Sequence, residues 1–185
     1  MISKQELRKY ANLKNYNLGQ AEKDYFQEII LFVLYKELGK ELVFKGGTAL
    51  TKCYGFDRFS EDLDFTATVD LDFDRIISNG LKKFYLDFES KQMDNKLVYR
   101  INGPLYANHP NTSCKIIIDI SRREQVVLDP LIKRIGMHIS EIPMFDVVVM
   151  AEQEIFAEKI RAIMTRNKAR DMYDMYYLVG KGITP

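Results

Sequence analysis

Residues 44–65 read FKGGTALTKCYGFDRFSEDLDF, and this stretch decides the fold of the chain. The apolar residues 42–44 predict a short strand, which leads into a Gly46-Gly47-Thr48 turn and a helix over residues 49–54 that Gly55 closes. Polar and apolar residues then alternate over residues 62–66, which is typical of a strand with two unlike faces. The sequence therefore predicts a strand, a tight turn, a helix and a second strand in direct succession.

Three aspartates are the candidate metal ligands. Asp62 and Asp64 lie two apart in one predicted strand, so both carboxylates project from the same face, with Cα atoms roughly 6.5–7 Å apart. Asp119 follows the apolar residues 116–118 of another predicted strand. If these strands are neighbours, the three carboxylates converge and suit Mg²⁺, or Mn²⁺ in its place, for phosphoryl or nucleotidyl transfer. Taken alone, a DxD pair is also typical of a solvated strand face.

The glycine turn upstream changes the balance between these two interpretations. Gly46 and Gly47 let a triphosphate approach the backbone, N–H groups at a helix start attract anions, and the Thr48 hydroxyl adds a donor. Turn and aspartates together indicate a nucleotide–metal site. Arg58 and Ser60 lie just before the aspartates, and there Arg58 could clamp a phosphate or form an ordinary surface salt bridge.

A second cluster of charge lies near the end of the sequence. Residues 159–170 contain five cations and no acid, and Lys159, Arg166 and Arg170 fall near one side of a helix. This pattern indicates either a solvated helix face or a local basic stripe. Asp171 and Asp174 follow at once, where they could cap a helix N-terminus and pair with Arg170.

The remaining periodicities complete the predicted architecture. Helices are expected over residues 3–14, 26–38 and 72–88, and again in two segments after Met150. Strands are expected over residues 96–101 and 114–120, with weaker candidates at 125–128 and 145–149, while 129–144 stay unassigned. The order predicts an α/β (α+β) fold with a mixed sheet flanked by helices. We expect residues 1–150 to form the core and residues 151–185 a helical C-terminal section packed on it.

Composition and charge exclude several classes of protein. With 185 residues, 46% of them hydrophobic, the chain can bury one ordinary core. A formal net charge of +1 excludes a general nucleic-acid coat protein, so any nucleic-acid contact is local. Cys53 and Cys114 have no CxxC spacing and, with only His109 and His138, form no convincing zinc set. The sequence shows no signal peptide and no apolar run of membrane-spanning length, so we expect a cytoplasmic protein without membrane contact.

Two regions of the chain resemble motifs of a known family. Residues 44–50 and 58–65, FKGGTAL and RFSEDLDF, resemble the first motif of the AbiEii/AbiGii (MenT-like) toxin nucleotidyltransferases. These enzymes belong to the DNA polymerase beta-like nucleotidyltransferase superfamily. Residues 154–162 and 170–174, EIFAEKIRA and RDMYD, resemble later motifs of the same family.

The resemblance implies a polymerase beta-like sheet and a site assembled around an NTP. In that site the glycine turn with Asp62 and Asp64 would hold Mg²⁺ and the NTP, and Asp119 would be the third carboxylate. Lys159 would match the lysine of the third motif, in contact with the triphosphate, and Asp174 the aspartate of the fourth.

The resemblance also implies a function. It points to a nucleotidyltransferase, the toxin of a type IV-like toxin–antitoxin or abortive-infection system, that adds nucleotides to an RNA acceptor such as the tRNA 3′ end. A cognate antitoxin would be a partner. Three alternatives stay open: transfer to a protein or small-molecule hydroxyl, a non-catalytic nucleotide- or partner-binding module, and hydrolysis of phosphodiesters. Many members continue into a larger C-terminal helical region, whereas this sequence ends at Pro185, so the acceptor is the least determined part.

Overall fold

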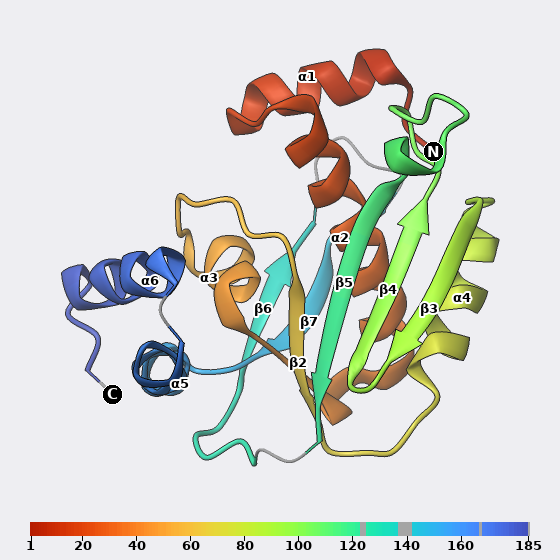
Figure 1. Ribbon diagram of the computed structural model, residues 1–185. Coiled ribbons are helices and arrows are strands. Elements are labelled where there is room, and N and C mark those ends of the chain that lie inside the picture. The colour runs from red at the N-terminus through yellow and green to blue at the C-terminus, as the bar shows by residue number, and fades with distance from the viewer. Residues whose placement is uncertain (123–124, 137–141, 167, 185) are drawn as a thin grey trace.

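The computed structural model describes residues 1–122, 125–136, 142–166 and 168–184, and their strands form one mixed sheet in the order β3-β4-β5-β2-β1-β7-β6 (Figure 1). The strands are β1 Leu42–Lys45, β2 Leu63–Ala67, β3 Phe88–Met93, β4 Lys96–Ile101, β5 Cys114–Ser121, β6 Leu131–Ile135 and β7 Phe145–Val149. The helices are α1 Lys4–Lys14, α2 Leu18–Leu38, α3 Gly46–Tyr54, α4 Phe73–Lys83, α5 Glu152–Thr165 and α6 Ala169–Gly180. The predicted α/β class is confirmed.

The centre of the sheet brings the candidate aspartates together. Strand β2 runs antiparallel to β1 and parallel to β5, so the two aspartate-bearing strands are direct neighbours. Asp64 is paired in register with Asp119 on β5 and with Lys45 on β1. Because paired residues point to the same face of a sheet, all three side chains lie on one face.

The opposite face of the sheet carries the core. Leu63, Phe65, Ile116 and Ile118 alternate with the aspartates and are fully buried. Helices α2 and α4 contact each other behind this face, and α5 and α6 lie on the other side of the molecule from β3 and α4 (Figure 1). The alternation that marked β2 as two-sided therefore separates the core from the candidate site.

The two N-terminal helices begin and end as their sequences predict. Ser3 and Glu6 form a reciprocal capping box at the start of α1, and Asn17 caps α2 in the same way. At the end of α2, Gly39 has a φ of 52°, a backbone conformation that glycine adopts without strain. Among the described helices, none has the length and apolar character needed to cross a membrane.

Two expectations about secondary structure are wrong, and the stretch that stayed unassigned contains a strand. The helix expected over residues 72–88 ends at Lys83, because Tyr85 has a φ of 53°, and Phe88 then begins β3. Residues 125–128 form no strand, since the backbone N–H groups of Val127 and Leu128 donate to the Glu154 carboxylate instead. Within the unassigned stretch lies β6, an edge strand whose sequence LIKRI lacks a clear alternation and in which only Ile135 is buried.

The C-terminal helices are attached to the rest of the chain by both aromatic and charged contacts. The ring of Phe56 stacks on Tyr177 at a centroid distance of 4.3 Å, and the Tyr177 hydroxyl donates to the carbonyl of Tyr54. Met164 on α5 and Tyr176 on α6 are 82% and 76% exposed. Charged contacts therefore provide much of the attachment of α6. Both cysteines are free, and His138 lies outside the described residues.

Candidate active site

The glycine segment approaches one aspartate more closely than any other residue type could. Strand β1 ends at Lys45 and α3 begins directly at Gly46, so the glycines form the first helical turn and not a separate turn before it. Gly46 has a φ of 76°, and a Cβ placed there would collide with Oδ2 of Asp64 and lie 3.1 Å from its Cγ. The backbone at Gly46 therefore forms a wall of the Asp64 environment.

The three carboxylates repel one another. The pKa of Asp64 is raised from 3.8 to about 6, first by burial and then by the negative charges of Asp62 and Asp119. The positive charges of Lys159 and Lys45 oppose this increase. Because like charges contribute to the raised pKa, a cation bound at this site would stabilise the ionised form of Asp64.

The donor set fits a divalent cation that arrives with phosphate ligands. Among the described residues, no group of three or more His, Cys, Asp and Glu side chains is arranged to hold a metal ion on its own. Instead Asp119 pairs with Lys96 at 3.0 Å, and Asp62 lies 4.0 Å from Arg170. Mg²⁺, however, needs only one or two carboxylates when phosphates and water complete its shell, and carboxylate oxygens are the hard donors it prefers.

Lys45 and Lys96 also belong to this site, although the sequence did not mark them as site residues. Lys45, only 7% exposed, lies opposite Asp64 and forms an ion pair with Glu158 of α5 at 2.7 Å. Lys96 lies opposite Asp119 on β4. The position of Lys45 in an apolar strand directly before the glycines could have indicated its role, since lysine is almost never fully buried unless it is paired. The role of Lys96 could be found only from the pairing of β4 with β5.

A second group of predicted residues meets at Gly47. A Cβ at this glycine would lie 2.8 Å from Nη2 of Arg58, 2.9 Å from Oγ of Ser60 and 3.5 Å from Oδ2 of Asp174. Nη2 of Arg58 contacts Oδ1 of Asp174 at 2.8 Å, and Nζ of Lys159 contacts Oδ2 at 2.7 Å. The first and last motifs of the chain therefore share one charged cluster beside the start of α3.

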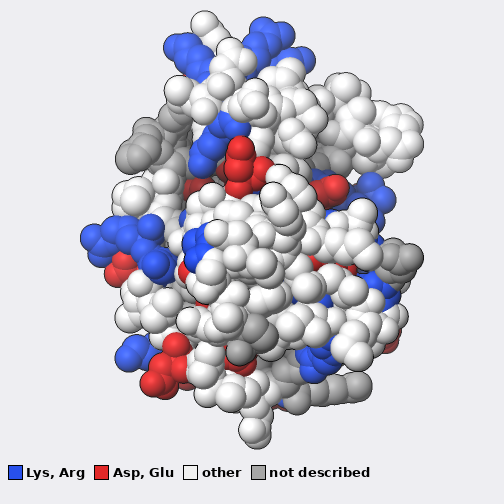
Figure 2. Space-filling model, turned by 90° about the vertical axis from the view of Figure 1, so that its left-hand side faces the viewer, with Lys and Arg blue, Asp and Glu red and all other residues white. Residues whose placement is uncertain are grey.

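The interpretations of the C-terminal charges need correction. Asp171 and Asp174 are fully buried, so they are not exposed capping residues, and neither has an ion pair with Arg170 in the described structure. Asp171 instead binds Lys159 at 3.1 Å and both Nε and Nη2 of Arg166. Two members of the expected basic stripe are thus occupied by buried carboxylates. Figure 2, which views the molecule from the side of α5 and α6, shows its cations in separate small groups.

Thr48 and Gln27 position the segment that carries Asp62. The Thr48 hydroxyl, expected to donate to a phosphate, is buried and donates to the backbone carbonyl of Asp62. The fully buried Gln27 donates from Nε2 to the carbonyl oxygens of Ser60 and Glu61, at 3.0 and 2.9 Å. These bonds hold the connection between α3 and β2. Gln27 is far from the motif in sequence, so no local pattern indicated it.

Asp64 and Asp119 line a cleft of about 420 Å³ between the sheet and α5, whereas Asp62 is not among its lining residues. Side chains of both signs line it, from Lys45, Asp64, Asn95, Asp119, Ser121, Glu158, Lys159, Arg161 and Arg166. Cations on α5 face carboxylates on the strands across this space. The cleft therefore suits a ligand that carries phosphates and a divalent cation together.

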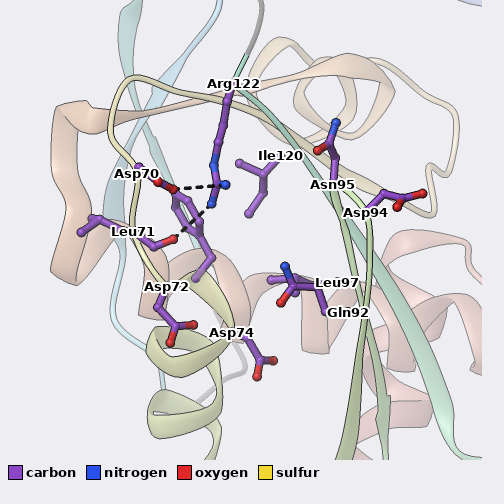
Figure 3. Close-up of a pocket in the computed structure, with 11 residues that line it drawn as sticks. Asp70, Leu71, Asp72, Asp74, Gln92, Asp94, Asn95, Leu97, Ile120 and Arg122 are labelled. Atoms are coloured by element: carbon purple, nitrogen blue, oxygen red, sulfur yellow. Dashed lines mark hydrogen bonds and ion pairs between the residues drawn. The ribbon is translucent and has the colours of Figure 1, made fainter.

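A neighbouring cavity of about 400 Å³ shares Asn95 with the cleft but has different chemistry (Figure 3). Four of its lining residues are aspartates: Asp70, Asp72, Asp74 and Asp94. Among the described residues that line it, Arg122 is the cation, and it is held by Asp70 at 3.1 Å and lies over the ring of Phe73. An acidic lining with an engaged cation repels phosphate, so this cavity suits a nucleotide less well than the cleft does.

Substitution of Gly46 by alanine is expected to reduce nucleotidyl transfer on the order of a hundredfold, because the new Cβ displaces the Asp64 carboxylate. Gly55→Ala is the matched control, since Gly55 has a similar φ of 75° but open space around the position of a Cβ. Both variants carry similar backbone strain, which thermal unfolding measures. Equal activity of the two variants would show that the close approach of Gly46 has no catalytic importance.

The sequence profile described as "Nucleotidyl transferase AbiEii toxin, Type IV TA system" matches residues 30–185. No curated protein sequence matches the chain. Among solved structures, JHP933 from Helicobacter pylori is similar over 96% of this chain and 67% of its own, with 21% identity and a TM-score of 0.59. The Cid1 poly(U) polymerase matches 65% of this chain and 39% of its own, with 17% identity and a TM-score of 0.32.

The likeness to the Helicobacter pylori protein extends over nearly the whole of this chain and concerns the fold, the mixed sheet and its flanking helices. The family profile covers β1, α3, β2, β5, α5 and α6, the elements that carry the carboxylates, the glycines and the charged cluster. The chain belongs to the AbiEii family of nucleotidyltransferase toxins.

Proposed function

We propose that this nucleotidyltransferase depends on Mg²⁺ and transfers nucleotides from an NTP to an RNA acceptor, such as the 3′ end of tRNA. The observation that supports this most strongly is the pairing of Asp64 with Asp119 beside the Gly46 backbone. Carboxylates on adjacent strands next to a helix start are an arrangement that phosphoryl chemistry uses. The RNA acceptor and an antagonising antitoxin are inferred from the toxin family.

In this proposal the carboxylates have separate roles. Asp62 and Asp64 would hold the cation, and Asp119 would complete the site and accept a proton from the acceptor hydroxyl. The hydroxyl oxygen then bonds to the α-phosphorus as the bond to the β-phosphate oxygen breaks and pyrophosphate leaves. The bound cation would neutralise charge on the phosphate oxygens. Mn²⁺ has similar ligand preferences and is expected to substitute.

The charged cluster at Gly47 is proposed to hold the triphosphate. Backbone N–H groups at Gly46 and Gly47 begin α3, where anions are favoured. Arg58 and Lys159 would contact the phosphates, with Ser60 as a further donor. Asp174 positions both cations, because its carboxylate touches each of them. Thr48 acts indirectly, through the Asp62 carbonyl.

The location of these residues suggests a division of the chain. Residues 1–150 would be the nucleotidyltransferase core with its N-terminal helices, and residues 151–185 a helical section that supplies Lys159 and Asp174 to the site. We propose a cytoplasmic location, where NTP and tRNA are found together.

Labelled nucleotides test the proposal. Purified protein is incubated with each α-labelled NTP, Mg²⁺ and total RNA, and we expect label at RNA 3′ ends, lost on addition of EDTA and restored by excess Mg²⁺. Label on protein would support the alternative acceptor. Label that stays in the free nucleotide pool under all conditions would contradict the proposed reaction.

A further inference from the structure

The face of the sheet that carries Asp119 continues as an open surface across β5, β4 and β3. Alternate residues of β5 and β4 are fully or nearly buried on the core side, while those between them are half-buried or exposed. On β3, Phe88 is half-buried and residues 89–93 are exposed. Figure 1 views this face directly, and no described helix lies in front of these three strands.

Cations dominate this open surface. Lys115 on β5 is paired in register with Arg100 on β4, and Arg100 with Glu89 on β3. Two residues further along the strands, on the same face, Ile117 of β5 lies opposite Val98 of β4, and Val98 lies opposite Lys91 of β3. Lys91, Arg100 and Lys115 have no ion pair with an acid anywhere in the described chain. We call these three residues the basic sheet face.

The basic sheet face leads to the candidate catalytic carboxylates. Lys115 lies four residues before Asp119 on the same strand, so their Cα atoms are about 13 Å apart. Lys96, in the row of Asp119, is already engaged by that carboxylate and is not counted with the free cations. A chain that lies along β5 and β4 with its end at Asp119 would pass over Arg100 and Lys115.

We propose that the basic sheet face binds the phosphate backbone of the single-stranded segment that precedes the 3′ end of the acceptor RNA. This inference rests on the proposed function, since it assumes an RNA acceptor. Three cations without an ion pair on one surface complement successive phosphates. In contrast, Lys159 on α5 and Arg166 just after α5 are both held by Asp171. Of the described residues of β3, β4 and β5 on this side of the sheet, none is aromatic, so binding is salt-dependent and tolerant of sequence.

Direct binding of a short fluorescein-labelled single-stranded RNA, measured by fluorescence anisotropy in EDTA without NTP, tests this surface. The test variant is K91A/R100A/K115A, and the matched control is K36A/K82A/K83A, which removes three exposed cations from α2 and α4 behind the sheet. Thermal unfolding of each variant confirms that it is folded. We expect the test variant to lose on the order of 10²-fold in affinity at ~0.1 M salt. Its slope of log affinity against log salt should fall by roughly 2, because each single-strand phosphate contact contributes ~0.7.

The outcomes separate this surface from the proposed reaction. Loss of affinity in the test variant and wild-type affinity in the control support the basic sheet face, even if no nucleotide is transferred. Equal affinity of wild type and test variant, with transfer to RNA intact, overturns the surface and leaves the reaction standing. Binding of polyglutamate in place of RNA would assign the face to an acidic protein and would also overturn the proposal.

Discussion

Replacement of Asp64 by asparagine is expected to lower nucleotidyl transfer on the order of 10³-fold, the magnitude seen when one charge-stabilising group is removed from a preorganised site. Asparagine preserves the shape of the side chain but removes the charge that lies between Asp62, Asp119 and the Gly46 backbone. The readout is incorporation of labelled nucleotide into RNA. Asp70→Asn is the control, because Asp70 is an exposed acid of the neighbouring cavity.

The same variant is expected to be more stable than the wild type at neutral pH. Because the pKa of Asp64 is raised from 3.8 to about 6 in the folded protein, the folded state holds this proton more tightly than the unfolded chain. The corresponding stabilisation is present below pH 3.8 and is lost as the pH rises through about 6. In EDTA, the free energy of unfolding by urea should therefore increase for the variant relative to the wild type as the pH rises between these values. A variant less stable than the wild type at pH 7 would contradict the repulsion between the carboxylates.

Replacement of Asp174 by alanine is expected to destabilise the fold by about 3–5 kcal/mol, the usual effect of removing one partner from a buried ion pair. The fully buried carboxylate contacts Arg58 at 2.8 Å and Lys159 at 2.7 Å, and without it both cations lose a close partner. Since Asp174 lies on α6, Lys159 on α5 and Arg58 before β2, the change also loosens the C-terminal helices from the sheet.

Urea denaturation measures this effect, and Asp146→Ala provides the comparison. Asp146 pairs with Arg134 through two contacts, at 2.8 and 3.1 Å, but on the exposed edge of the sheet. Solvent screens such pairs, so we expect Asp146→Ala to lose far less stability than Asp174→Ala. Similar losses for the two variants would mean that the Asp174 cluster contributes no more than a surface pair.

Local sequence predicted the parts of the fold that depend on short-range patterns. The capping box at Ser3, the stop at Gly39 and the two-sided strand around Asp64 all follow from residues close in sequence. The proximity of Asp119 to Asp64 required one further assumption, that their strands are neighbours, and β2 and β5 do pair in parallel. That pairing is the central contact of the candidate site.

The rest depended on contacts between distant residues. The sequence marked Lys159 and Asp174 as charged helix positions, but only the packing of α5 against α6 shows that they contact one another. Lys96 faces Asp119 because β4 pairs with β5, and the strand at Phe88 exists because it pairs with β4. The amphipathic pattern of residues 72–88 is continuous, so it cannot reveal that the backbone conformation of Tyr85 ends the helix. Tertiary pairing decided these features and local periodicity did not.

Nucleotide binding to the metal-loaded protein tests most directly whether the carboxylates and the glycine segment form one nucleotide–metal site. Calorimetric titration of each NTP into wild-type protein, with Mg²⁺ and with EDTA, is repeated with Asp64→Asn and with the control Asp70→Asn. We predict that wild type and control bind at least one NTP in the presence of Mg²⁺, and that EDTA and Asp64→Asn each abolish this binding. Binding of the same NTP with equal affinity by wild type and Asp64→Asn, with or without Mg²⁺, would contradict the assignment of the site.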